Sequence, residues 1–184
     1  LIPAMRPGSV IAIHATITPA SCVALAAQCA ARGISLIDAP VSGGGIGAAA
    51  GTLTVMCGGS QQAFDAAKPV FESFGKLIVL LGDVGAGQRA KLVNNALMAA
   101  NMGLAHAALG AGAALGIERE ALVELIRQSS GRSFGFDVYA RLPAGLVLMA
   151  AALVAAGLAA ASATSQSKVL LVAATWVEAP AGGL

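Results

Sequence analysis

Short apolar runs rich in β-forming residues alternate with longer segments of helical spacing over the first 82 residues. Four such runs predict buried strands, at residues 9–16, 34–40, 52–59 and 76–82. Segments with apolar residues at helical spacing separate the first run from the second and the third from the fourth. This alternation predicts crossover units and an open α/β sheet.

Local signals mark the ends of the two predicted helices. Thr18 followed by Pro19 is typical of a helix start, and Gly33 suits the position after the end of that helix. Ser60 is a suitable first cap for the second helix. Pro69 is expected to kink or divide this second helix, because proline lacks the N–H that the helix needs.

The pattern changes near residues 83–87. Residues 88–116 carry no turn signal and little charge, which predicts one helix of about 28 residues, about 42 Å long. A helix with so few polar residues is expected to be covered by protein over most of its circumference. Residues 116–131 predict a second helix, with Glu118 and Glu120 in its first turn and Gly131 ending it. The fold class is therefore α/β followed by all-α, with domains at residues 1–84 and 85–184.

The chain from residue 144 to residue 161 holds 18 residues without a charge. By length alone it is a transmembrane candidate, although no aromatic belt flanks it. Three interpretations stay open: a membrane span, a buried or interface helix, and an aberrant sequence. A membrane partner is disfavoured.

Composition narrows the classes of partner and compartment. Apolar residues make up 57% of the chain and aromatic residues 4%, so the core is built from small and aliphatic side chains. A net charge of +2 without a basic patch argues against nucleic acid. Cys22, Cys29 and Cys57 lack metal-ligand spacing and favour buried free thiols in the cytoplasm. His14 and His106 lie too far apart in sequence to suggest a metal site.

Ser42 and the glycines at 43, 44 and 45 follow a predicted buried strand. Open α/β sheets bind ligands beyond the carboxyl ends of their strands. Glycine backbone N–H groups hold anions well, because no Cβ keeps the ligand away. The segment is either a loop for a carboxylate or phosphate or a flexible turn.

Lys91 and Asn95 lie four residues apart near the start of the long helix, so they share one face. A lysine in a partly desolvated cleft has a lowered pKa and can exchange a proton. The alternative is an ordinary solvated lysine. Thr16, just after the first strand, is either a cofactor contact or a turn residue, and Arg132 either attracts an anion or is simply solvated.

Three motifs in one order resemble the β-hydroxyacid dehydrogenase family. They are "DAPVSGG" at 38–44, "AxxGTLTVMxGG" at 48–59 and "GxGxxxKxxxN" at 85–95. The resemblance implies that Lys91 is the general acid/base and that Asn95 positions the substrate. It also implies that Ser42, Gly43 and Gly44 hold the substrate carboxylate.

The resemblance further implies a partial Rossmann-like domain that binds NAD or NADP, with Thr16 contacting the cofactor. Ala15 stands where the family has serine. The implied reaction is hydride transfer between the nicotinamide and a small 3-hydroxy acid. The long apolar helix, which needs cover, favours a homo-oligomer, the cysteines favour the cytoplasm, and no metal site is expected.

Two features depart from the family. No G-x-G-x-x-G turn leads into a helix, since the glycines at 43–51 precede a strand. The stretch after residue 143 lacks the family's Lys-Asp pair. We therefore expect an incomplete piece of a dehydrogenase with weak or no activity. The alternative is a non-catalytic helical module for dimerisation or membrane association.

Overall fold

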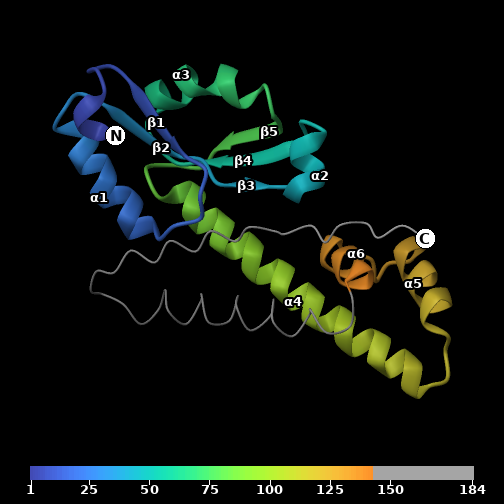
Figure 1. Ribbon diagram of the computed structural model, residues 1–184. Coiled ribbons are helices and arrows are strands. Elements are labelled where there is room, and N and C mark those ends of the chain that lie inside the picture. Colours follow the sequence, from blue (N-terminus) through green and yellow to red (C-terminus); the bar gives the residue numbers. More distant parts are fainter. Residues whose placement is uncertain (143–184) are drawn as a thin grey trace. The chain divides into compact units, whose positions relative to one another are not determined.

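The computed structural model describes residues 1–142, which form two compact units. The first contains residues 1–91 and the second begins at residue 92. The elements of the first unit, in order, are η1 (Ile2–Ala4), β1 (Val10–Ile13), α1 (Pro19–Ala30), β2 (Ser35–Asp38), β3 (Val41–Ser42), α2 (Gly44–Ala49), β4 (Leu53–Cys57), α3 (Gln61–Phe71) and β5 (Gly75–Leu80). Helix α4 (Ala86–Ala114) begins in this unit (Figure 1).

The strands pair in both directions. Strand β1 is parallel to β2 and β4 is parallel to β5, while β3 is antiparallel to β4. A bridge between Asp38 and Gly58 extends the antiparallel pairing onto β2, so β2 and β3 follow one another along β4. The expected crossover units are present as β1–α1–β2 and β4–α3–β5. The connection from β3 to β4 is instead antiparallel, because the short helix α2 reverses the chain there.

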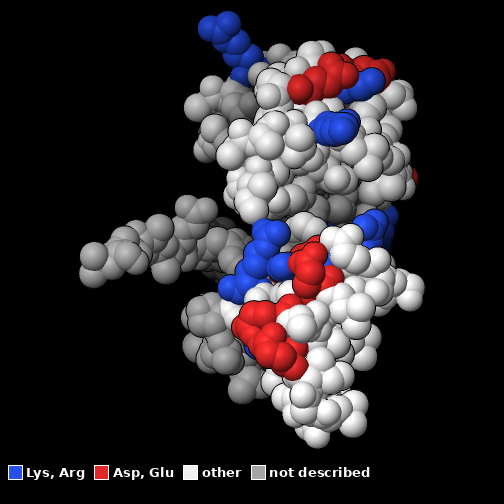
Figure 2. Space-filling view, turned by 90° about the vertical axis from the view of Figure 1, so that its right-hand side faces the viewer, with Lys and Arg blue, Asp and Glu red and all other residues white. Residues whose placement is uncertain are grey.

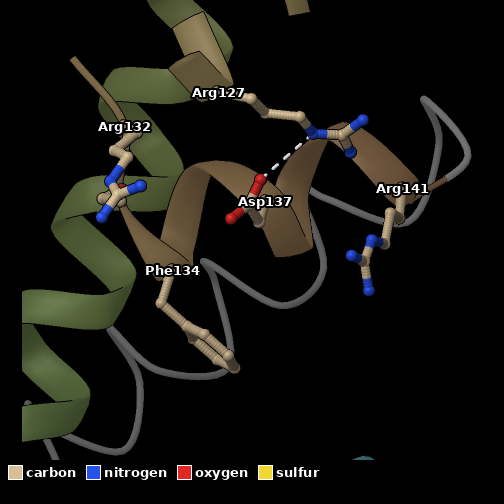
Figure 3. A pocket seen from close by; sticks show the side chains of 6 residues that line it. Arg127, Arg132, Phe134, Asp137 and Arg141 are labelled. Atoms are coloured by element: carbon tan, nitrogen blue, oxygen red, sulfur yellow. Dashed lines mark hydrogen bonds and ion pairs between the residues drawn. The ribbon is translucent and has the colours of Figure 1, made fainter. Parts of the chain in front are cut away.

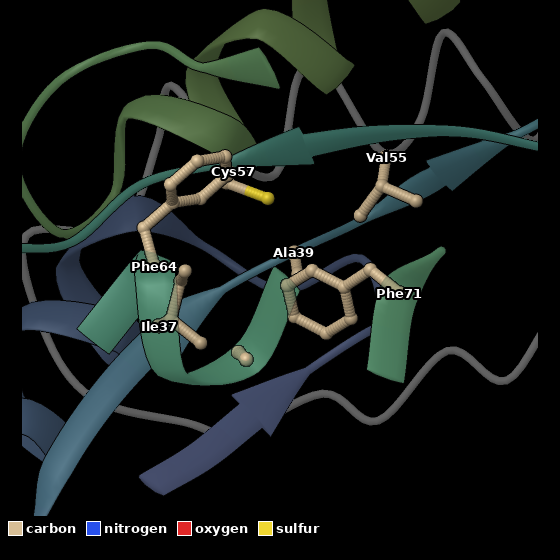
Figure 4. Packing of buried hydrophobic residues seen from close by; sticks show 7 residues of the cluster. Ile37, Ala39, Val55, Cys57, Phe64 and Phe71 are labelled. Atoms are coloured by element: carbon tan, nitrogen blue, oxygen red, sulfur yellow. The ribbon is translucent and has the colours of Figure 1, made fainter. Parts of the chain in front are cut away.

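Helices α1 and α3 cover opposite faces of these strands (Figure 1). Leu36 on β2 packs with Cys29 of α1, while its neighbour Ile37 packs with Phe64 and Phe71 of α3. Figure 4 shows the α3 side of this packing. Successive residues of a strand point to opposite faces, so both faces of β2 are buried, as its continuous apolar run predicts.

All three cysteines are buried and free, as expected. Burial raises the pKa of the Cys22 thiol to about 12 and that of Cys57 to about 11, and the carboxylate of Asp38 adds to both shifts. Thiols with such pKa values remain protonated at neutral pH, so they serve packing rather than nucleophilic chemistry.

The predicted helix starts are confirmed. Thr18 accepts a hydrogen bond of 3.1 Å from the Ser21 N–H, and Ser60 accepts one of 3.2 Å from the Ala63 N–H. Pro69 does not divide the helix, because α3 continues to Phe71. Pro69 lies in the last turn, where the loss of one backbone hydrogen bond interrupts little of the helix.

The second unit holds the rest of α4, then α5 (Arg119–Gln128) and α6 (Phe134–Arg141). Glu118 is the N-cap of α5 rather than part of its first turn, and α5 ends at Gln128, before Gly131. The core of this unit consists of Met102, Ala105, Leu109, Phe136 and Tyr139. His106 bonds the Tyr139 hydroxyl at 2.7 Å, which agrees with a structural histidine.

The described residues leave part of the apolar surface of α4 exposed, so the cover expected for this helix is not supplied within residues 1–142. Val93, Leu97 and Leu104 are 71%, 62% and 68% exposed. Within residues 1–142, α4 is the one helix long and apolar enough to cross a membrane by length and composition. The candidate span at residues 144–161 lies outside the described residues.

Candidate functional site

The carboxyl ends of β1 and β2 meet at one edge, since Ile13 and Asp38 are parallel partners. Residues that follow these two strands therefore lie together, at the kind of edge where open α/β sheets bind ligands. His14 follows β1, bonds the Ala39 carbonyl at 2.8 Å and packs edge-on against Phe71. His14 thus links the ends of the two strands.

Thr16 is exposed in the loop after β1, and a buried glutamine holds the residues on both sides of it. Gln88 Nε2 donates to the Ala15 carbonyl at 2.8 Å, and the Ile17 N–H donates to Gln88 Oε1 at 3.1 Å. Gln88 has no exposed surface. The Ala15 carbonyl and the Ile17 N–H are therefore already satisfied, while Thr16 between them is exposed.

Lys91 lies three residues after Gln88 on α4 and is partly buried. Burial lowers the pKa of its ammonium group below the ordinary value. Such a group gives up a proton more readily than a solvated lysine, which agrees with an exchange of protons with a substrate. Asn95 is also partly buried and lies about 6 Å further along the helix, at a rise of about 1.5 Å per residue.

One stripe of α4 changes from polar to apolar along the helix. Its members follow each other at intervals of three and four residues: Gln88, Lys91, Asn95, Met98, Met102, Ala105 and Leu109. This spacing keeps side chains on one face. The last three are buried in the helical core, while the first three carry amide and amine groups. The polar beginning of this stripe is therefore a candidate site rather than a solvated helix end.

Ser42 ends β3, and the glycines after it adopt conformations that favour glycine. Gly43 has φ +129° and caps α2, while Gly44 has φ +61°. A Cβ on Gly43 would also lie 3.0 Å from the Leu53 side chain. The segment is an ordered turn into a six-residue helix, not the direct lead into a strand that we expected.

Within residues 1–142, no hydrogen bond joins Ser42, Gly43 or Gly44 to Lys91. Ser42 lies four residues beyond Asp38, and four residues of extended chain span about 13 Å. Ser42 is therefore not an immediate neighbour of Asp38 in the sequence. The role of these three residues with a substrate carboxylate therefore stays a prediction.

A concave surface of about 480 Å³ lies in the helical unit, lined by Arg127, Arg132, Ser133, Phe134, Asp137 and Arg141. Arg127 Nε donates to Asp137 Oδ1 at 3.1 Å, which offsets one of the positive charges. Figure 3 shows the three guanidinium groups on different sides of α6 rather than turned toward one point. Arg132 thus shares this surface with two other arginines, but the three guanidinium groups do not converge on one anion site.

Charges of both signs lie next to each other on the face shown in Figure 2. No continuous basic surface is visible on that face among the described residues.

The sequence motifs did not reveal two buried residues that organise this edge. Asp38 and Gln88 are both fully buried, and each makes hydrogen bonds to residues far away in sequence. The signal that could have indicated them is the pair of glycines Gly58 and Gly87. Each lacks the Cβ that would collide with Asp38.

Two families match the chain one after the other. Residues 1–82 match the family described as the NAD binding domain of 6-phosphogluconate dehydrogenase. Residues 85–144 match the family described as the NAD-binding domain of NADP-dependent 3-hydroxyisobutyrate dehydrogenase.

Curated relatives agree with these matches. The chain is 43% identical over 139 residues to NAD-dependent L-serine dehydrogenase of Pseudomonas aeruginosa, an alignment that covers 76% of the chain and 47% of that protein. It is 42% identical over 137 residues to 2-(hydroxymethyl)glutarate dehydrogenase of Eubacterium barkeri, covering 74% and 46%. The chain thus spans about half the length of the curated relatives it matches.

Solved structures share the fold. 3-Hydroxyisobutyrate dehydrogenase of Mycobacterium tuberculosis, solved with L-serine, has a TM-score of 0.72 and 28% identity, covering 90% of this chain and 62% of that one. The Salmonella typhimurium 3-hydroxyisobutyrate dehydrogenase has a TM-score of 0.70 and 26% identity, covering 86% and 67%.

Proposed function

The chain belongs to the β-hydroxyacid dehydrogenase family, and on that premise we propose that it carries the proton-transfer part of an NAD- or NADP-dependent dehydrogenase. The substrate class is a small 3-hydroxy acid. One observation carries the proposal: the partly buried Lys91 follows, by three residues, the glutamine that holds the loop of Thr16.

Thr16 would contact the nicotinamide end of such a cofactor. Thr16 offers an exposed hydroxyl at the carboxyl edge of β1, while Gln88 satisfies the backbone on either side of it. When bound, the nicotinamide supplies the hydride chemistry.

Lys91 would exchange the proton of the substrate hydroxyl. In oxidation its neutral amine accepts this proton, and in reduction its ammonium returns it to the carbonyl oxygen. Asn95, one turn along, would hydrogen-bond the same oxygen and fix its position relative to the amine. Ser42, Gly43 and Gly44 would bind the carboxylate, which sets the chemical class of the substrate.

The proposal is tested in a hybrid enzyme. In it, the matching 139 residues of the Pseudomonas L-serine dehydrogenase are replaced by those of this chain. We expect NAD- or NADP-dependent oxidation of at least one small 3-hydroxy acid, measured as NAD(P)H absorbance. A folded hybrid without turnover on any tested 3-hydroxy acid would refute the proposed function.

We also propose that α4 associates with a second copy of the chain. The support is the exposed apolar row of Val93, Leu97 and Leu104. Sedimentation velocity of the chain without detergent should show a dimer or larger species, which dissociates when Leu97 is replaced by glutamate. A soluble monomer would contradict this, and solubility only in detergent would favour a membrane-associated module instead.

A further inference from the structure

A fully buried carboxylate caps the start of α4 from a strand far away in sequence. Asp38 Oδ1 accepts from the Gly85 N–H at 2.6 Å, and Oδ2 accepts from the Gln88 N–H at 2.8 Å. Helix-starting N–H groups have no partner within the helix, and the helix dipole favours a negative charge beside them. Within residues 1–142 no ion pair involves Asp38, and its two oxygens are hydrogen-bonded by these backbone N–H groups.

Gln88 links this cap to the loop of Thr16. Its backbone N–H donates to Asp38, while its side-chain amide bonds both Ala15 and Ile17. The oxygen faces an N–H group and the nitrogen faces a carbonyl, so the orientation of the amide is determined by its partners. Asp38 and Gln88 together form a continuous chain of hydrogen bonds, the Asp38–Gln88 bridge, from β2 through α4 to the loop after β1.

The surrounding backbone is shaped to admit this bridge. A Cβ on Gly58 would lie 2.6 Å from Asp38 Oδ1 and 2.8 Å from the Ala86 N–H nitrogen. A Cβ on Gly87 would lie 2.9 Å from Asp38 Oδ2. Two glycines thus leave room for β4 and α4 to approach the carboxylate from two sides.

From this geometry we infer that Asp38 and Gln88 are positioning residues for the reaction proposed above. The bridge holds two groups in one rigid arrangement: the Thr16 hydroxyl toward the nicotinamide and the first turns of α4, which carry Lys91. Neither positioning residue touches the substrate. The inference rests on the proposed function, and its test therefore includes measurements that do not depend on turnover.

The first measurement uses the whole chain and follows amide hydrogen exchange by NMR. The variant Gln88→Met keeps the length of the side chain and removes both amide hydrogen bonds. We expect the Ile17 N–H to exchange about tenfold faster or more, since the loss of one hydrogen bond shifts local opening by about that factor. Gln61→Met, at an exposed glutamine of α3, is the matched control and should leave the Ile17 exchange rate unchanged.

A second variant tests whether the bridge transmits its effect. Asp38→Asn keeps one acceptor and replaces the other with an amide NH₂ group, which cannot accept from a backbone N–H. Among the described residues Asp38 makes no hydrogen bond to Ile17, yet we expect the Ile17 N–H to exchange faster in this variant too. If the exchange rate of the Ile17 N–H were unchanged in both folded variants, the inference that the Asp38–Gln88 bridge holds the loop of Thr16 would be overturned.

The second measurement is the affinity of the hybrid enzyme for NADH, read by fluorescence. Gln88→Met should weaken NADH binding about tenfold, the equivalent of one lost contact from Thr16, while the KM of the hydroxy acid changes little. Asp38→Asn should lower kcat as well, because it loosens the turns that carry Lys91. Faster Ile17 exchange with unchanged NADH affinity would reduce the bridge to a purely structural role and overturn the inference.

The two hypotheses fail in different ways. A hybrid that binds NADH without turnover refutes the proposed function, and the Gln88→Met affinity still decides the inference about Thr16. A hybrid that binds no NADH overturns both.

Discussion

Replacement of Lys91 by alanine should lower the kcat of the hybrid enzyme about 10³-fold. Positioned general acid–base groups contribute roughly 10²- to 10⁴-fold, and Lys91 is the one amine at the polar beginning of the α4 stripe. NADH affinity should remain within about threefold of the parent, because Thr16 is held by Gln88 and not by Lys91. Steady-state kinetics and NADH fluorescence measure the two effects.

Lys76→Ala is the matched control for this experiment. Lys76 is an exposed lysine on β5, and its loss should leave kcat unchanged. A Lys91→Ala hybrid that retains a third or more of the parent kcat would remove Lys91 from the mechanism.

The lowered pKa of Lys91 also predicts in which direction the free energy of unfolding changes with pH. Between its folded pKa and the ordinary value of 10.5, the unfolded chain binds more protons at this site than the folded chain. The contribution of Lys91 to the free energy of unfolding therefore rises with pH across that window. Urea unfolding of the chain and of Lys91→Met at several pH values checks this. The difference between their free energies of unfolding should rise with pH, because the raised pKa values of Cys22 and Cys57 lower the stability of both proteins alike over this range.

Gly87→Ala should destabilise the chain by about 3 kcal/mol, a large effect for a single methyl group. The added Cβ would collide with the Met56 carbonyl oxygen and lie 2.9 Å from Asp38 Oδ2. Both are fixed, one by β4 and the other by its hydrogen bonds to α4. Overpacking typically costs about 1–3 kcal/mol, and displacement of Asp38 would add the cost of unsatisfied buried groups. Urea denaturation measures the difference.

Gly103→Ala supplies the control in the same helix. Gly103 has no neighbour within 4 Å of the position of its missing Cβ. Alanine is about 1 kcal/mol better than glycine inside a helix, so this variant should be equally or more stable than the parent. If both substitutions had the same effect, the close approach at Gly87 would not exist in solution.

Local patterns were sufficient to predict most elements. The caps at Thr18 and Ser60 and the long α4 depend on residues within a few positions of each other, and short-range signals identify them. Pro69 was misjudged because its cost depends on how much helix follows it. The antiparallel β3–β4 pairing was also missed, because a Gly-rich stretch can equally be a loop or, as here, a short helix.

The candidate site was predictable only in part, for a physical reason. Lys91 and Asn95 share a helix face, which spacing reveals. The contacts of Asp38 with Gly85 and Gln88 join residues 47 and 50 positions apart, and no period in the chain encodes them. The glycines at 58 and 87 enter the sequence analysis only as motif positions, whereas in the structure they make room for Asp38.

The three buried thiols allow the unfolding of the first unit to be followed by chemical labelling. Cys22, Cys29 and Cys57 all belong to the first unit, and the sequence has no cysteine after residue 57. A thiol-labelling reagent can therefore modify the chain only when the strands and α1 open. The rate of labelling measures the opening of that part alone, and events confined to residues 92–142 leave it unchanged.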